Sequence, residues 1–135
     1  MTTRIVTGPS LDFDRFWRWL KNHPNCILEA GTPDCMMHDH DSLHWHLTED
    51  EERNPVVQLI LGKMLVGEMV LDVHDALFVQ STLAEASAED TEDEEPGHCL
   101  FEVMTGSSDE PVSRYHFVLA HGYDEEMIHH IRMAQ

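Results

Sequence analysis

Histidine and cysteine side chains gather between Cys35 and His46, the densest set of potential metal ligands in the chain. His44 and His46 are two residues apart, so on a β-strand both imidazoles would project from one face and could hold an ion between them. Neutral imidazole suits zinc, iron, copper or nickel. Cys35 and His38 add a thiol and an imidazole at a spacing that can hold one metal in a turn. The pattern therefore predicts a divalent transition-metal site, with zinc as the first choice.

Two ligand sets can be drawn from this segment. A closed structural site would use Cys35, His38, His44 and His46. An open catalytic site would use the two strand histidines with the carboxylate of Glu51. The alternative is an exposed polar sheet face beside a turn rich in histidine and aspartate, without a metal. The spacing alone leaves these interpretations open.

The open set resembles a known family motif. His44 and His46, followed after four residues by Glu51, are similar to the first metal-binding motif of the cupin family. The resemblance covers eight residues and implies a metal-dependent oxygenase or isomerase, with a fourth ligand supplied by His74 or His98. The glycines that the family places around this motif do not occur at the matching positions of this chain.

Motifs for other catalytic chemistry are not found in the sequence. His98 and Cys99 are adjacent, and neighbouring side chains on a strand point to opposite faces, so these two cannot form a nucleophilic dyad. The chain contains no Gly-x-Ser-x-Gly elbow, phosphate-binding glycine loop or dinucleotide fingerprint. No catalytic residue is assigned outside the metal hypothesis.

The net charge of the chain limits the kinds of molecule that we expect it to bind. The 135 residues include 8 basic and 26 acidic side chains, for a net charge of −18. Such a chain repels nucleic acids and anionic membranes and attracts basic proteins or cations. Small acidic α+β chaperones of secretion systems share this size and charge, although no motif links the chain to them. We therefore expect a non-enzymatic binding or adaptor protein, with a homodimer as a second form of association; the alternative is a metal-dependent hydrolase or cupin-like enzyme.

Targeting signals and membrane spans are not expected. Charged residues interrupt the most apolar stretch, so no run of about 18 apolar residues exists. The first ten residues have no apolar core of a secretory signal. Three cysteines are too few for a disulfide framework. The expected location is the cytoplasm, and the expected organisation is a single domain over residues 1–135.

The most apolar stretch, residues 56–83, is predicted to form the core. Glycine and aspartate divide it into segments near 57–66, 68–74 and 76–83. A strand is preferred for 57–66, because Gly62 would cost about 1 kcal/mol inside a helix. A helix opening at Pro55 remains the alternative.

The remaining elements follow from periodicity. Apolar side chains at i, i+3, i+4 and i+7 predict a helix over residues 11–22. Further strands are predicted at 26–30, 43–47, 98–105 and 112–120, the last two as a hairpin. Residues 85–97 are acidic and are expected to form a mobile loop, and a second helix is expected after Gly122. These elements predict an α+β two-layer domain, with a mainly antiparallel sheet of about five strands flanked by N-terminal and C-terminal helices.

Overall fold

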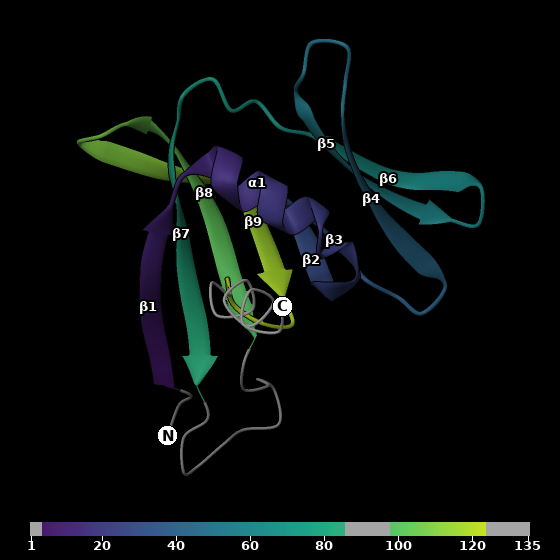
Figure 1. Cartoon of the computed structure of the whole chain (residues 1–135), viewed down its shortest axis with the longest axis horizontal. Coiled ribbons are helices and arrows are strands. Elements are labelled where there is room, and N and C mark those ends of the chain that lie inside the picture. Colours follow the sequence, from purple (N-terminus) through teal and green to yellow (C-terminus); the bar gives the residue numbers. More distant parts are fainter. Residues whose placement is uncertain (1–3, 86–97, 124–135) are drawn as a thin grey trace, which may run out of the picture.

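The computed structural model describes residues 4–85 and 98–123 (Figure 1). Within them the fold is mainly β, with nine strands, one α-helix and one short 3-10 helix. In chain order the elements are β1 (Arg4–Leu11), α1 (Phe13–Lys21), η1 (Pro24–Cys26), β2 (Ile27–Thr32), β3 (Cys35–His38), β4 (Leu43–Glu49), β5 (Pro55–Leu61), β6 (Met64–Val70), β7 (Ala76–Glu85), β8 (Cys99–Ser107) and β9 (Glu110–Leu119).

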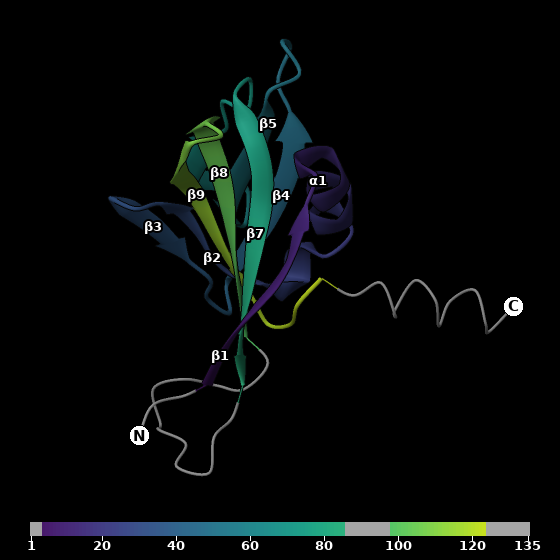
Figure 2. The same cartoon turned by 90° about the vertical axis from the view of Figure 1, so that its left-hand side faces the viewer.

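The strands form two separate antiparallel sheets. The large sheet has six strands in the order β1-β7-β8-β9-β2-β3. The small sheet has three strands in the order β4-β5-β6, which follow one another along the chain. α1 lies across one face of the large sheet, and the small sheet stands to one side of the helix (Figures 1 and 2).

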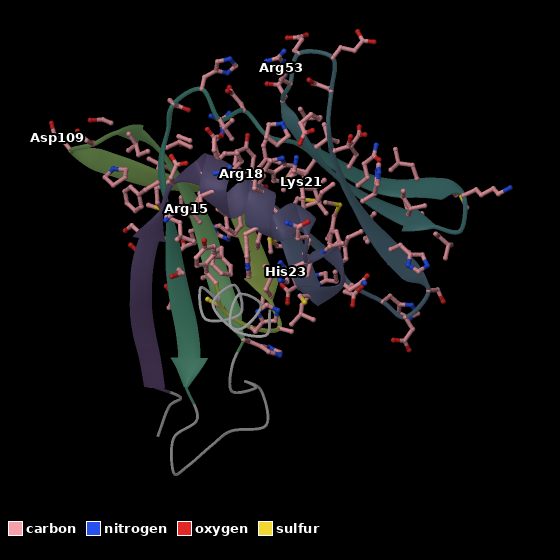
Figure 3. All side chains as sticks on the ribbon, viewed as in Figure 1. Arg15, Arg18, Lys21, His23, Arg53 and Asp109 are labelled. Atoms are coloured by element: carbon pink, nitrogen blue, oxygen red, sulfur yellow. The ribbon has the colours of Figure 1, made fainter. Side chains whose placement is uncertain are left out.

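Helix α1 confirms the prediction for residues 11–22. Asp12 caps its first turn by accepting a hydrogen bond from the backbone N–H of Arg15 at 3.3 Å. The opposite side of the helix carries the exposed basic residues Arg15, Arg18 and Lys21, which are labelled in Figure 3. Pro24 then opens η1, because proline is tolerated in the first turn of a helix but not in its interior.

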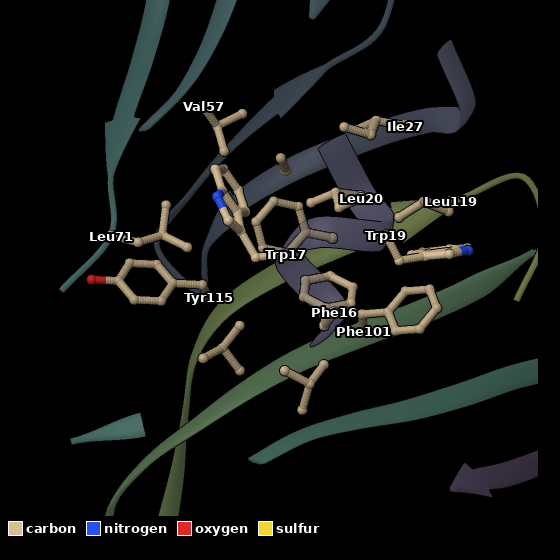
Figure 4. Packing of buried hydrophobic residues seen from close by; sticks show 14 of the residues in the cluster. Phe16, Trp17, Trp19, Leu20, Ile27, Val57, Leu71, Phe101, Tyr115 and Leu119 are labelled. Atoms are coloured by element: carbon tan, nitrogen blue, oxygen red, sulfur yellow. The ribbon is translucent and has the colours of Figure 1, made fainter. Parts of the chain in front are cut away.

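The buried side of α1 supplies aromatic rings to the centre of the core (Figure 4). The Phe16 ring lies 5.1 Å from that of Phe101 on β8 and 5.5 Å from that of Phe117 on β9. All three side chains are fully buried. Packing of this kind removes large apolar surfaces from water and fixes the helix over the centre of the large sheet.

The small sheet joins the same core through one of its faces. Trp45, Val57 and Leu59 are buried and belong to the cluster that includes the α1 aromatics. After β6, the backbone N–H of Asp72 donates to the Tyr115 hydroxyl of β9 at 2.8 Å. The two sheets therefore share a core while having separate hydrogen-bonded ladders.

A second link ties the small sheet to α1. The Glu49 carboxylate at the end of β4 accepts from the Lys21 ammonium at 2.8 Å and from the Trp17 indole N–H at 2.7 Å. The hydrogen bond from Lys21, followed by that from Trp17, holds the pKa of Glu49 below its ordinary value.

The predicted fold class is wrong, because the domain is mainly β rather than α+β, and its strands number nine rather than about five. Two strands were missed. No element is predicted before the helix at 11–22, where β1 lies, and Cys35–His38, which forms β3, is predicted as a turn. The predicted helix after Gly122 and most of the predicted acidic loop lie outside the described residues.

The apolar stretch from 56 to 83 contains β5, β6 and the start of β7, with a turn at 62–63 and a non-strand segment at 71–75; this confirms the preference for a strand over a helix at 57–66. The first segment is a hairpin rather than one strand. β5 ends at Leu61 and β6 begins at Met64, and Gly62 makes the turn with a φ of 63°. Glycine adopts this left-handed conformation at little cost.

The predicted strand at 43–47 and the predicted hairpin at 98–105 and 112–120 are present as β4, β8 and β9. On β9, Tyr115, Phe117 and Leu119 are all buried, as their alternation indicates. In the described part of the chain, no helix has the length and apolar character needed to cross a lipid bilayer.

Candidate protein-binding surface

His44 and His46 project from the exposed face of β4, as predicted from their spacing. Trp45, between them, is buried on the opposite face. The imidazole Nδ1 of His46 donates to Gln58 Oε1 at 3.0 Å, and Gln58 Nε2 donates to Glu68 Oε2 at 2.7 Å. This polar row crosses all three strands of the small sheet and orients the His46 ring along the sheet.

Cys35 and His38 lie at the two ends of β3, on the other sheet. Three residues of separation on a strand place the two side chains on opposite faces, so the predicted turn that would clamp a metal does not form. His38 instead lies 3.7 Å from the Glu29 carboxylate on β2.

Glu51 lies beyond the end of β4 in an exposed turn. The turn is organised by Asp50, whose carboxylate accepts from the backbone N–H groups of Glu52 and Asn54. In residues 4–85 and 98–123, no three histidine, cysteine or acidic side chains lie together in a way that could hold a metal ion. The metal site stays a sequence-based prediction, which elemental analysis of protein purified without a histidine tag would test.

Exposed apolar side chains concentrate on the hairpin of β5 and β6. Of seven large hydrophobic residues that are exposed in the described chain, five lie here. We call them the hairpin patch: Leu61, Met64, Leu65, Val66 and Val70. Met64 is 59% exposed and Leu65 is 50% exposed, values that leave much of each side chain in water. A concentration of this kind is typical of a surface that another molecule covers.

Strand pairing assigns part of the hairpin patch to the face that carries the histidines. Leu65 lies opposite Ile60, which lies opposite His44. Residues directly opposite one another in antiparallel strands share a face, so apolar and polar side chains alternate across this outer face. The register of β6 shifts next to Val66, which has no directly opposite residue on β5.

β6 is also an open edge among the described strands. It pairs with β5 on one side and is the last strand of the small sheet. The other edge strand, β4, lies against η1 and is tied to α1 through Glu49. An unpaired edge leaves backbone N–H and C=O groups able to pair with an added strand.

The small sheet and its loops, residues 43–75, contain seven acidic and two basic side chains. Beyond β6, His74 donates to the Asp72 carboxylate at 2.8 Å. This hydrogen bond raises the pKa of His74 and lowers that of Asp72. The hairpin patch therefore lies within an acidic part of the chain.

The sequence reading assigned the residues of this patch to the core and so missed them as surface. One signal was available. Met64, Leu65 and Val66 are three consecutive apolar residues followed by Gly67 and Glu68, and this run lacks the strict alternation of a strand that buries one face. β8, by contrast, alternates regularly between buried and half-buried positions.

Comparisons of the chain with protein-family models, curated proteins and solved structures found no match.

Proposed function

We propose that this protein is a non-enzymatic binding protein that accepts an extended, basic segment of a partner protein along β6. The observation that carries the proposal is the coincidence of two features on one strand. Among the described strands β6 is the open edge of the small sheet, and it bears most of the hairpin patch.

An extended segment of a partner bound along β6 would use both the open edge and the hairpin patch. Its backbone would continue the β4-β5-β6 ladder, and its alternate side chains would cover Leu65 and Val70 on the outer face. A helix laid on the same surface would cover apolar side chains and leave the edge hydrogen-bonding groups to water. Backbone pairing would supply affinity, and the apolar contacts would supply selectivity.

Charge favours a basic partner over a second copy of this chain. Two copies, each with a net charge of −18, repel one another, whereas lysine or arginine beside the bound segment would meet the acidic residues around the small sheet. Association with such a partner would be fast at low ionic strength and would weaken as salt is added.

The test uses three synthetic peptides and fluorescence anisotropy at two salt concentrations. The first peptide has three lysines beside alternating valine and threonine, the second replaces the lysines with glutamates, and the third keeps the lysines but carries a central proline. Proline has no backbone N–H and interrupts strand pairing. We expect measurable binding of the first peptide and at least tenfold weaker binding of the other two.

A matched pair of variants locates the site. The double change Leu65→Ser and Val70→Ser removes apolar surface from β6 without altering charge and should weaken the first peptide about tenfold. Val112→Ser removes an exposed valine, 60% exposed compared with 49% for Val70, from the large sheet and should leave binding unchanged. Equal effects of both variants, or no binding of any peptide, would contradict the proposal. If sedimentation experiments show a dimer that forms through β6, the molecule bound along this strand is a second copy of the chain rather than a basic partner.

A further inference from the structure

A thiol and an imidazole from distant parts of the chain meet beside α1. Cys26, the last residue of η1, places its Sγ 3.1 Å from the Nε2 of His121, just beyond β9. The two residues are 95 positions apart, so no local motif in the sequence indicates the contact. Neither side chain belongs to the surface proposed above for a partner.

The backbone holds both groups in place. The Cys26 N–H donates to the His23 carbonyl at 3.0 Å, and its own carbonyl accepts from the Ala120 N–H at 2.9 Å. His121 Nδ1 lies 2.9 Å from the Gly122 carbonyl oxygen. A carbonyl can only accept, so Nδ1 carries the proton and Nε2 is the free acceptor that faces the sulfur.

Aromatic rings surround the pair on one side. The Trp19 ring makes an edge contact with His121 at 5.8 Å, and it also packs against His23 and Tyr123 at 4.8 and 5.3 Å. The indole N–H of Trp19 is buried and has no hydrogen-bond partner among the described residues. Cys26 is only partly buried.

The three cysteines occupy three different environments. Burial raises the pKa of Cys99 to about 11, and it also raises the pKa of Cys26. Cys35 is exposed. An unassisted Cys26 would therefore react more slowly than Cys35 near neutral pH, because the thiolate is the attacking species. An adjacent imidazole that accepts the proton during the attack changes this order.

We propose that Cys26 and His121 form a nucleophilic pair that reacts with small disulfides bearing apolar or aromatic substituents, which makes Cys26 a site of reversible mixed-disulfide formation. Its proton passes to His121 Nε2 while Cys26 Sγ forms a bond to one sulfur of the disulfide. The original S–S bond breaks, and the released thiolate takes the proton from the imidazolium. The Cys26 sulfur is oxidised, the released sulfur is reduced, and no other reactant is needed.

The test follows reaction with 4,4′-dithiodipyridine, a small aromatic disulfide whose released thiol absorbs light. Two proteins each keep one candidate cysteine, and the remaining cysteines are replaced by serine or, for Cys99, by alanine. His121→Asn is added to each, because asparagine can keep the donor to Gly122 while Nε2 is lost. We expect the Cys26 rate at pH 7 to fall about a hundredfold, within the range of general-base assistance, and the Cys35 rate to stay within twofold.

The rates of the two single-cysteine proteins at pH 7, with His121 kept in both, test the proposal even if the asparagine variant is unstable. Within the described residues, the titratable groups packed with His121 are Cys26 and His23, and Tyr123 contacts the same Trp19 ring. With imidazole as the base, Cys26 should react faster than Cys35 at pH 7, although burial raises the pKa of the Cys26 thiol. A Cys26 rate below that of Cys35, or one that is unchanged by His121→Asn in folded protein, would overturn the proposal.

Discussion

The two sheets of this protein differ in how far their apolar side chains are buried. On β8, at the centre of the large sheet, every second residue from Cys99 to Thr105 is buried, and α1 covers that face. On β6, at the edge of the small sheet, five of seven residues are exposed and only Met69 is buried. Composition alone does not distinguish the two strands, because both are rich in large apolar side chains.

The difference comes from what lies next to each strand. β8 has a paired strand on either side and an aromatic helix above it, so burial of its alternate side chains is complete. β6 has a neighbour on one side and contributes mainly Met69 to the shared core. The large sheet therefore buries the alternate side chains of its central strand, whereas the edge of the small sheet leaves most of its side chains in water.

The largest loss of stability should follow from a substitution in the core of the large sheet. Phe101→Ala empties a fully buried site on β8 beside the Phe16 ring. We expect a loss of about 3–5 kcal/mol in the free energy of unfolding, the usual cost of truncating a core aromatic residue. Chemical denaturation measures it, and a loss below about 1 kcal/mol would contradict the central place of β8 in the core.

A smaller loss of stability should follow from a substitution where the two sheets meet. Tyr115→Phe keeps the buried ring and removes the hydroxyl that accepts from the Asp72 N–H. We expect a loss of about 1 kcal/mol, because the amide loses its partner in a partly buried place. Equal stability of the two proteins in urea would show that the hydrogen bond does not hold the small sheet on the large one.

The link between Glu49 and α1 should depend on pH. The pKa of this carboxyl is lower in the folded protein than in the unfolded chain, because Lys21 and Trp17 donate to the charged form. Its contribution is therefore present above the unfolded pKa of about 4.3 and is lost as the pH falls through the lower, folded value.

Glu49→Gln should cost less than about 1 kcal/mol at pH 7, since solvent screens this partly exposed pair. The stability difference between wild type and variant should shrink during acid titration. A difference that is the same at pH 7 and pH 3 would exclude the charge of Glu49 as its cause.

The smallest effect on stability should come from the hairpin patch. Leu65→Ser removes a half-exposed side chain from an edge strand, and we expect a change of less than about 0.5 kcal/mol in the free energy of unfolding. A loss of 2 kcal/mol or more would show that β6 belongs to the core in solution and would remove the contrast between the two sheets.

The sequence predicted those elements whose apolar residues face one buried side. Helix α1, strand β4 and the β8-β9 hairpin were all found from their periodicity. β3 was missed because Cys35–His38 has exposed ends and, among the described strands, pairs with β2 alone, so no alternation marks it. The split of the apolar stretch into a buried β5 and an exposed β6 could not be predicted, because burial there depends on which strand lies at the edge.

The same limit applies to the candidate sites. Spacing correctly placed His44 and His46 on one exposed face, because alternation on a strand is a local property. It could not place Cys35 and His38 on a different sheet from these histidines, since that depends on the long-range pairing of β3 with β2. The contact of Cys26 with His121 also depends on topology, here the pairing of β2 with β9.

The strand order of the large sheet also has a consequence for how the chain folds during synthesis. β1 pairs with β7, and β2 pairs with β9, so the sheet cannot close until most of the chain has left the ribosome. The β4-β5-β6 unit needs only neighbouring strands and can form much earlier. A nascent chain would thus display its apolar edge before the core that anchors it exists. This order makes the interval before β9 emerges the period of greatest exposure to misassembly and to chaperones.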